Sequence, residues 1–224
     1  MPPLRVAAGY VTVALIWGST WGAIKIGVND VPPFVFAFVR AVAVASLLTV
    51  VAVALRQPFP RGRRTIGVAV VVGLINLGWS WAIAAILQSR FLTRVAPVPA
   101  VALGSWASVL LLSPLAFGQL SAGWHWTTPS ILALAYLVVF GTGFAMVVSL
   151  WLYRKLRPTT ITLIQVVVPA EAILIGTLWL GEPVTIRMLA GAALVVAAVA
   201  LNAIAGGGAP PAEERLAATP AAAD

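Results

Sequence analysis

The stretch from Thr160 to Glu182, TITLIQVVVPAEAILIGTLWLGE, decides how the rest of the chain is interpreted. It is long and apolar enough to cross the hydrocarbon core of a bilayer as a helix. Pro169, near its middle, frees a backbone carbonyl that needs another partner. Glu171 places a carboxylate at the same depth, where it costs at least about 2.5 kcal/mol in lipid. Both features predict a helix that faces protein or a water-filled cavity.

The composition predicts an integral membrane protein. Of 224 residues, 61% are hydrophobic and only 9% are charged, whereas a soluble domain carries about 25% charged residues. The net charge is +8, but the basic residues cluster in short loops between apolar runs. That distribution is typical of cytoplasmic loops and not of a nucleic-acid-binding face. We therefore expect the chain to lie in the lipid bilayer and to bind no nucleic acid.

Enzyme chemistry is not expected. The chain has no cysteine and a single histidine, His125, in a loop between two tryptophans. No metal-ligand cluster, P-loop or Ser/His/Asp set is visible in the sequence. We therefore predict no metal, no cofactor and no catalytic residues.

Apolar runs long enough to span a bilayer predict an all-α, polytopic helix bundle of about seven transmembrane helices. Their short connections predict that successive helices are antiparallel neighbours. Residues 206–224 are rich in Gly, Pro and Ala, which predicts a disordered tail. The seven runs cover residues 9–28, 32–55, 66–87, 95–117, 131–152, 160–182 and 185–205.

The first run carries a polar and aromatic face. Trp17, Trp21 and Lys25 are four residues apart and share that face, while Gly18 and Gly22 form an adjacent small-residue stripe that allows close helix packing. One interpretation is that Lys25 contributes to a substrate site with the tryptophans as walls. The other is that Lys25 reaches the interface from near the helix end and the tryptophans only pack.

Further polar residues lie in other runs. Arg40 lies about two turns into the second run, either as a cavity-lining cation or as a paired structural group. Glu171 is the strongest candidate for a proton-binding site, or else is neutralised by Arg40 or Lys25. Gln165 and Trp81 complete the candidate substrate site. Structural roles are predicted for the Pro169 kink and for a turn in which Gly181 ends one helix and Glu182 caps the next.

Several segments resemble the EamA type of the drug/metabolite transporter superfamily. ALIWGSTWGAIKIGV (14–28) and VPPFVFAFVR (31–40) are similar to the family's opening helix pair, and residues 166–201 are similar to its closing pair. WSWAIAAILQSR (79–90) resembles the start of the second repeat. The family usually has ten helices in two inverted five-helix repeats. The resemblance therefore implies a shortened member: a partial first repeat (1–65) and a five-helix second repeat (66–205).

The shortening creates a conflict over topology. The loop with Arg56, Arg61, Arg63 and Arg64 and the loop with Arg90 and Arg94 flank one apolar run, and both favour the cytoplasm. Three solutions to this conflict are open. The third run does not fully span the membrane, the first helix pair inserts against its charge preference, or the chain inserts in mixed orientations. The loop at 118–130 has no Lys or Arg and is expected outside.

The resemblance implies a multi-pass transporter in the cell membrane, the bacterial inner membrane, that exports amino acids or related metabolites. Proton coupling through Glu171 and a homodimer that completes the shortened bundle are further expectations. The alternative is a shortened membrane interaction subunit without transport activity.

Overall fold

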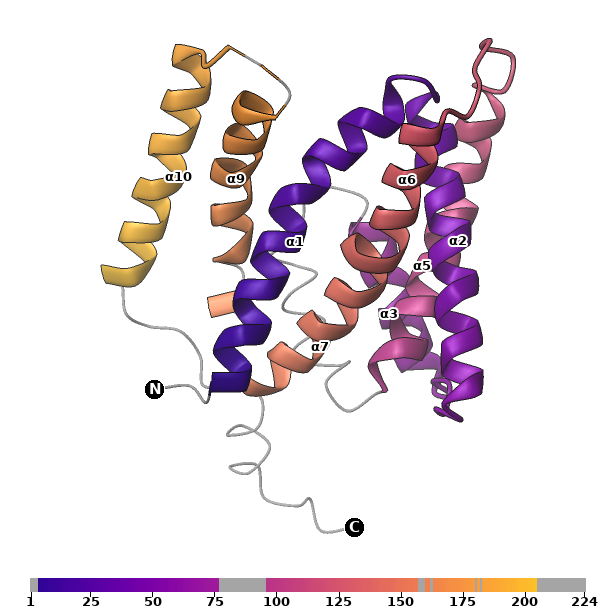
Figure 1. Cartoon of the computed structure of the whole chain (residues 1–224). Helices are drawn as coiled ribbons and strands as arrows, with labels where there is room; N and C mark the ends of the chain where they lie inside the picture. Colours follow the sequence, from indigo (N-terminus) through magenta and orange to yellow (C-terminus); the bar gives the residue numbers. More distant parts are fainter. Residues whose placement is uncertain are drawn as a thin grey trace.

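The computed structural model describes residues 4–76, 96–156, 160, 161, 163–179, 181 and 183–204. These residues form helices and connecting turns, without a strand, as the sequence predicts. Helices α6, η2 and α7 follow one another without a break, so the described part of the chain forms seven helical rods (Figure 1). The elements are α1 (Leu4–Val28), α2 (Pro33–Ala54), α3 (Arg63–Asn76), α5 (Pro97–Phe117), α6 (Thr128–Tyr136), η2 (Leu137–Phe144), α7 (Ala145–Lys155), α9 (Ile164–Leu178) and α10 (Ile186–Ile204).

Four of the described helices are long and apolar enough to cross a membrane: Leu4–Val28, Pro33–Ala54, Pro97–Phe117 and Thr128–Lys155. The prediction of a helical membrane bundle is confirmed. Helix α9 has 15 residues and is only about 22 Å long at 1.5 Å per residue. Helix α3 has 14 residues and reaches about 21 Å. Both are shorter than the roughly 30 Å hydrocarbon core.

Antiparallel packing of α2 on α5 defines the two ends of the bundle. The Phe34 amide at the start of α2 donates to Gln119 just beyond α5, over 3.0 Å. Further along α2, Leu48 and Ala52 pack with Val98 and Ala102 near the start of α5. We call one end of the bundle the arginine-rich end. It holds the first turn of α1, the end of α2, the start of α5 and the end of α7. Its described basic residues are Arg5, Arg56, Arg61, Arg63, Arg64, Arg154 and Lys155.

Helix α3 starts at the arginine-rich end and runs parallel to α5. Gly104 of α5 lies against Ala69 and Gly73 of α3, and the Ser108 hydroxyl, one turn further along α5, donates to the Gly73 carbonyl over 3.2 Å. Both helices therefore begin at the same end (Figure 1). Of the expected span at 66–87, the structure describes the part up to Asn76, and the remainder lies outside the described residues.

Helix α9 lies beside α1 and runs in the same direction. Gly18 of α1 lies against Glu171, and Gly22, one turn later, lies against Ile175, one turn later on α9. Helix α10 packs along α9 at the edge of the bundle (Figure 1). Its outward side chains remain uncovered within the described protein, as expected for a lipid-facing helix.

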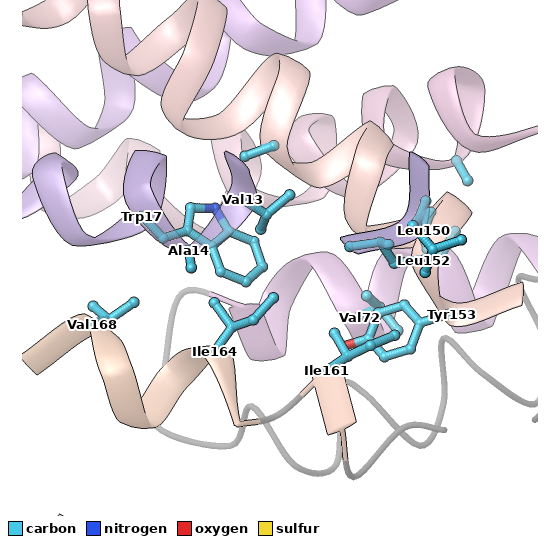
Figure 2. Packing of buried hydrophobic residues seen from close by; sticks show 14 residues of the cluster. Val13, Ala14, Trp17, Val72, Leu150, Leu152, Tyr153, Ile161, Ile164 and Val168 are labelled. Carbon is cyan, nitrogen blue, oxygen red and sulfur yellow. The ribbon is translucent and has the colours of Figure 1, made fainter. Parts of the chain in front are cut away.

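The largest cluster of buried side chains joins these helices near the arginine-rich end. Figure 2 shows Trp17 and Ala14 of α1 facing Val168 and Ile164 of α9. Tyr153 of α7 closes the cluster from a third helix. The side chains of this cluster interdigitate and hold α1, α7 and α9 together. The central part of the bundle contains a cavity.

Candidate functional site

A cavity of about 720 Å³ lies in the centre of the bundle. Its walls come from α1, α2, α3, α5, η2, α7, α9 and α10, so both predicted repeats contribute. The volume is within the roughly 300–1,000 Å³ typical of small-molecule sites. Most of the lining is apolar, and the described polar side chains that face it include Thr20, Arg40, Ser105, Ser108 and Thr142.

Arg40 is the only ionisable residue among the described residues that line this cavity. It is the eighth of the 22 residues of α2 and is partly buried. Within the described part of the chain, its guanidinium has no hydrogen-bond or salt-bridge partner. A cation at membrane depth is costly without a counter-charge. The cavity therefore presents a positive charge that an anionic group could neutralise.

The π-helical segment η2 forms the wall at the level of Trp17. The Trp17 indole N–H donates to the Gly141 carbonyl over 3.2 Å, and only 9% of Trp17 is exposed. An added Cβ at Gly141 would lie 2.9 Å from the Thr20 methyl group, so the Thr20 side chain would have to shift. Gly141 and Thr142 both face the cavity. Single π-helical turns inside α-helices often mark functional sites.

Glu171 lies between α9 and α1 and does not line the cavity. Its carboxyl group fills the space that a side chain at Gly18 would need. The Oε2 atom is buried and has no hydrogen-bond partner among the described residues. Pro169 and Ala172, on either side of Glu171 along α9, do line the cavity. The structure thus brings Glu171 next to the cavity wall, and it does not pair it with Arg40.

A second, smaller cavity of about 260 Å³ adjoins the first. It is lined by the predicted site residues Trp21 and Lys25, with Gly22 and Gly176 among its other walls. Trp21 also lines the central cavity. The face that carries Trp17, Trp21 and Lys25 therefore runs from the central cavity into this second one.

Comparison with known proteins assigns the fold to a family. The EamA-like transporter family matches residues 69–204, which is more than half of the chain. The chain belongs to the EamA-like transporter family. The match covers α3 to α10, including every helix of the predicted second repeat. As a member of this family, the protein is a membrane transporter.

Two curated relatives agree with this assignment. The chain is 20% identical to the uncharacterized transporter YoaV of Bacillus subtilis (strain 168), across 89% of this chain and 97% of that protein. A segment of 57 residues is 37% identical to an uncharacterized transporter of Buchnera aphidicola subsp. Schizaphis graminum (strain Sg), across 25% of this chain and 19% of that protein. No solved structure matches the chain significantly.

The alignment with YoaV shows by how much this EamA-like chain is shorter. It runs over 282 positions and uses 89% of 224 residues, which is about 199 residues. About 83 positions thus have no residue from this chain, although nearly all of the relative is covered. That is about three helices with their loops. These totals do not say where along the chain the positions are missing, so the shortened first repeat stays a prediction.

For some predicted residues the structure does not describe a side-chain position. Trp81 and Glu182 are outside the described residues, and of Gln165 only the backbone, in α9, is described. Gly181 has a positive φ of 64° in the turn after α9, a conformation that glycine adopts at low cost. Helix α9 ends at Leu178, so Gly181 lies further beyond the helix than a residue that directly terminates it.

Sequence reasoning missed the hydroxyl groups of the cavity. Ser105 and Ser108 of α5 and Thr142 of η2 face it, yet each is a common residue inside apolar helices. The one signal was the glycine pair in Phe140–Phe144, FGTGF, which is where the helix adopts the wider π geometry. Hydropathy alone does not separate such a segment from an ordinary span.

Proposed function

We propose that this EamA-like protein transports small metabolites that carry a carboxylate, amino acids or related compounds, out of a bacterial cell across its inner membrane. The observation that carries the proposal is the central cavity with Arg40 as its described charge. A mostly apolar cavity with one cation that has no partner among the described residues favours a small organic anion or a zwitterion. Hydroxyl groups from α5 and η2 are available to hold the remaining polar atoms.

The position of Arg40 supports binding in the middle of the bilayer. Arg40 is eight residues into α2, whose 22 residues are long enough to span. It is therefore about 11 Å along the helix axis. A carboxylate bound there accepts the hydrogen bonds that the guanidinium would otherwise donate to water. Because both groups are planar and matched in geometry, they favour a bidentate contact.

Proton coupling is part of the proposal. The Glu171 carboxyl group lies against α1, with one oxygen buried and without a partner in the described structure. A charged carboxylate there needs water or a cation, whereas a protonated one fits an apolar helix contact. Loss and gain of one proton would thus change how closely α9 packs on α1, and α9 forms part of the cavity wall.

The shortened first repeat favours a homodimer or a reduced carrier that functions alone. It also motivates the alternative function, a membrane subunit that binds a partner and carries nothing. A cavity formed by helices from both predicted repeats supports transport over the alternative. A chain with the alternative function would show no flux.

The proposal is tested by counterflow in vesicles that contain the purified protein. Vesicles are loaded with a panel of unlabelled amino acids and small carboxylates, and uptake of labelled compound is measured. Arg40→Gln is expected to lower uptake at least about tenfold, because removing the charge partner of a buried carboxylate costs about 1.4 kcal/mol or more. Arg40→Lys should retain part of the activity.

Arg187→Gln provides the matched control, because Arg187 is an exposed arginine of α10 that does not line the cavity. Its uptake should equal that of the unchanged protein. No uptake of any compound by the unchanged protein would support the interaction subunit. Equal uptake by Arg40→Gln and Arg187→Gln would remove Arg40 from substrate binding.

A further inference from the structure

The second cavity lies at the end of the bundle opposite the arginine-rich end. Lys25 is three residues from the end of α1, and Gly176 is two residues from the end of α9. Because α1 and α9 are parallel, both helix ends lie at that opposite end. Met188, near the start of α10, completes this part of the wall. The cavity is thus placed between the central cavity and the surface that lacks the arginine clusters.

The two cavities share part of their walls. Trp21, Ala172, Ile173 and Met188 line both, whereas Lys25 and Gly22 line only the smaller one and Arg40 only the larger one. The indole of Trp21 is the largest of the shared side chains. It therefore lies at the boundary between a space that holds Arg40 and a space that holds Lys25.

The two tryptophans of this face differ in how they are held. The Trp17 indole is 9% exposed and bonded to Gly141. The Trp21 side chain is 57% exposed, and its indole makes no hydrogen bond within the described part of the chain. Trp17 is fixed to η2, whereas Trp21 has space to change its rotamer. A side chain of that size can open or close a passage without movement of a helix.

Two basic side chains lie one after the other along the path from the central cavity to the smaller one. Arg40 lies in the central cavity, and Lys25 lies beyond Trp21, about one helical turn further along α1. The described residues that line the smaller cavity include no acidic side chain. An anionic group that leaves Arg40 through this passage would meet a second cation before it reaches bulk water.

We propose that the smaller cavity is an outer vestibule, that Trp21 is the gate between it and the central cavity, and that Lys25 is a second carboxylate-binding residue on the exit path. This inference rests on the proposed function, because it assumes that a carboxylate leaves the central cavity. It adds a second binding position, a direction of travel and a gating residue to that function. Trp21 and Lys25 act in sequence: the gate opens, and the cation receives the anion.

The chain has no cysteine of its own, so single cysteines report on each space separately. Met188→Cys places a thiol in the vestibule wall, and Ser105→Cys places one in the central cavity only. Intact vesicles with the opposite end exposed are treated with membrane-impermeant thiol reagents, one negatively charged and one neutral. The measured quantity is the rate of modification of each cysteine.

Two results are expected. With Met188→Cys, the negatively charged reagent should react about fivefold faster than in the same protein with Lys25→Gln, because a nearby cation raises the local anion concentration. The neutral reagent should be unaffected. With Ser105→Cys, Trp21→Ala should raise the rate several-fold from this side, whereas Trp21→Phe, which keeps a large ring, should leave it low.

Arg187→Gln is the control for charge, because it removes a cation from the same end of the molecule but not from either cavity. If Arg187→Gln and Lys25→Gln lowered the rate of modification equally, the positive charge of this end as a whole would attract the reagent. That result would overturn the role of Lys25. An unchanged Ser105→Cys rate in Trp21→Ala would overturn the gate. These labelling rates need no transported substrate, so they distinguish failure of the vestibule from failure of the proposed transport.

Discussion

At the scale of single residues, the contact between Gly18 and Glu171 sets the distance between α1 and α9. Any side chain at Gly18 would overlap the carboxyl group of Glu171, and at Gly22 an added Cβ would lie 2.9 Å from Ile175. The glycine stripe therefore brings a carboxyl group into a helix contact that is otherwise apolar. Such a contact is sensitive to whether the carboxyl group carries a charge.

The prediction that follows concerns Glu171→Gln. Glutamine keeps the shape of the side chain but cannot release a proton, so the contact with α1 no longer changes with pH. We expect transport driven by an imposed proton gradient to fall to the level seen without a gradient, while counterflow without a gradient persists. The measurement compares uptake of labelled substrate into vesicles with and without the gradient. A mutant that still responds to the gradient would exclude Glu171 from proton coupling.

Residue identity in the sequence was enough to select this contact but not to place it. GxxxG spacing and an intramembrane carboxylate are visible without a structure, and both were predicted to matter. Their partnership joins positions 18 and 171, which no local pattern connects. The same holds for Trp17 and Gly141, a hydrogen bond between residues 124 positions apart. Distant pairs depend on how the helices assemble, and one sequence does not contain that information.

At the scale of the elements, α3 and α5 show that helices can be predicted from hydropathy and that the contact between two helices cannot. Apolar residues continue from Ile66 to Leu87, so hydropathy predicts a complete span. Helix α3 is the part of this run that the structure describes, up to Asn76. What keeps α3 in place is the backbone contact of Gly73 with Gly104, which lets two parallel helices approach closely.

Replacing Gly73 should separate these helices. An added Cβ would overlap the Gly104 backbone, which cannot move aside as a flexible side chain can. We expect Gly73→Ala to destabilise the protein by about 1–3 kcal/mol, the usual cost of overpacking. Thermal unfolding in detergent measures the change, at about 2–4 °C per kcal/mol for a chain of this size.

Gly67→Ala is the matched control on the same helix, because an added Cβ there meets nothing within 4 Å. Its melting temperature should be unchanged or slightly higher, since alanine favours a helix more than glycine does. Equal melting temperatures for the two variants would show that the α3–α5 contact is not as close as the structure has it.

At the scale of the whole molecule, the ends of the helices show where the described arginine clusters lie. The arginines at 56–64 lie at the end where α5 begins, because α2 ends and α5 starts at the same end of the bundle. Arg154 and Lys155 at the end of α7 lie there as well. The described arginine clusters thus lie at one end, which the positive-inside rule predicts to be cytoplasmic, and the loop at 118–127, without Lys or Arg, lies at the other end. The ends of α2 and α5 agree with the first of the three solutions that the sequence left open, a third run that does not fully span; residues 77–95, with Arg90 and Arg94, lie outside the described residues, so this solution stays a prediction.

Topology labelling decides between this arrangement and a complete third span. Gly62→Cys and Ser121→Cys place single thiols at exposed positions before α3 and after α5. With one net crossing between them, the two cysteines lie on opposite sides, and an impermeant reagent added to intact cells should modify Cys at position 121 but not at position 62. Two complete spans would instead put both cysteines on the same side, and the reagent would modify both or neither. Leu156→Cys, after α7, serves as the internal reference. One span, Thr128–Lys155, separates it from position 121, so it should be shielded from the reagent as position 62 is.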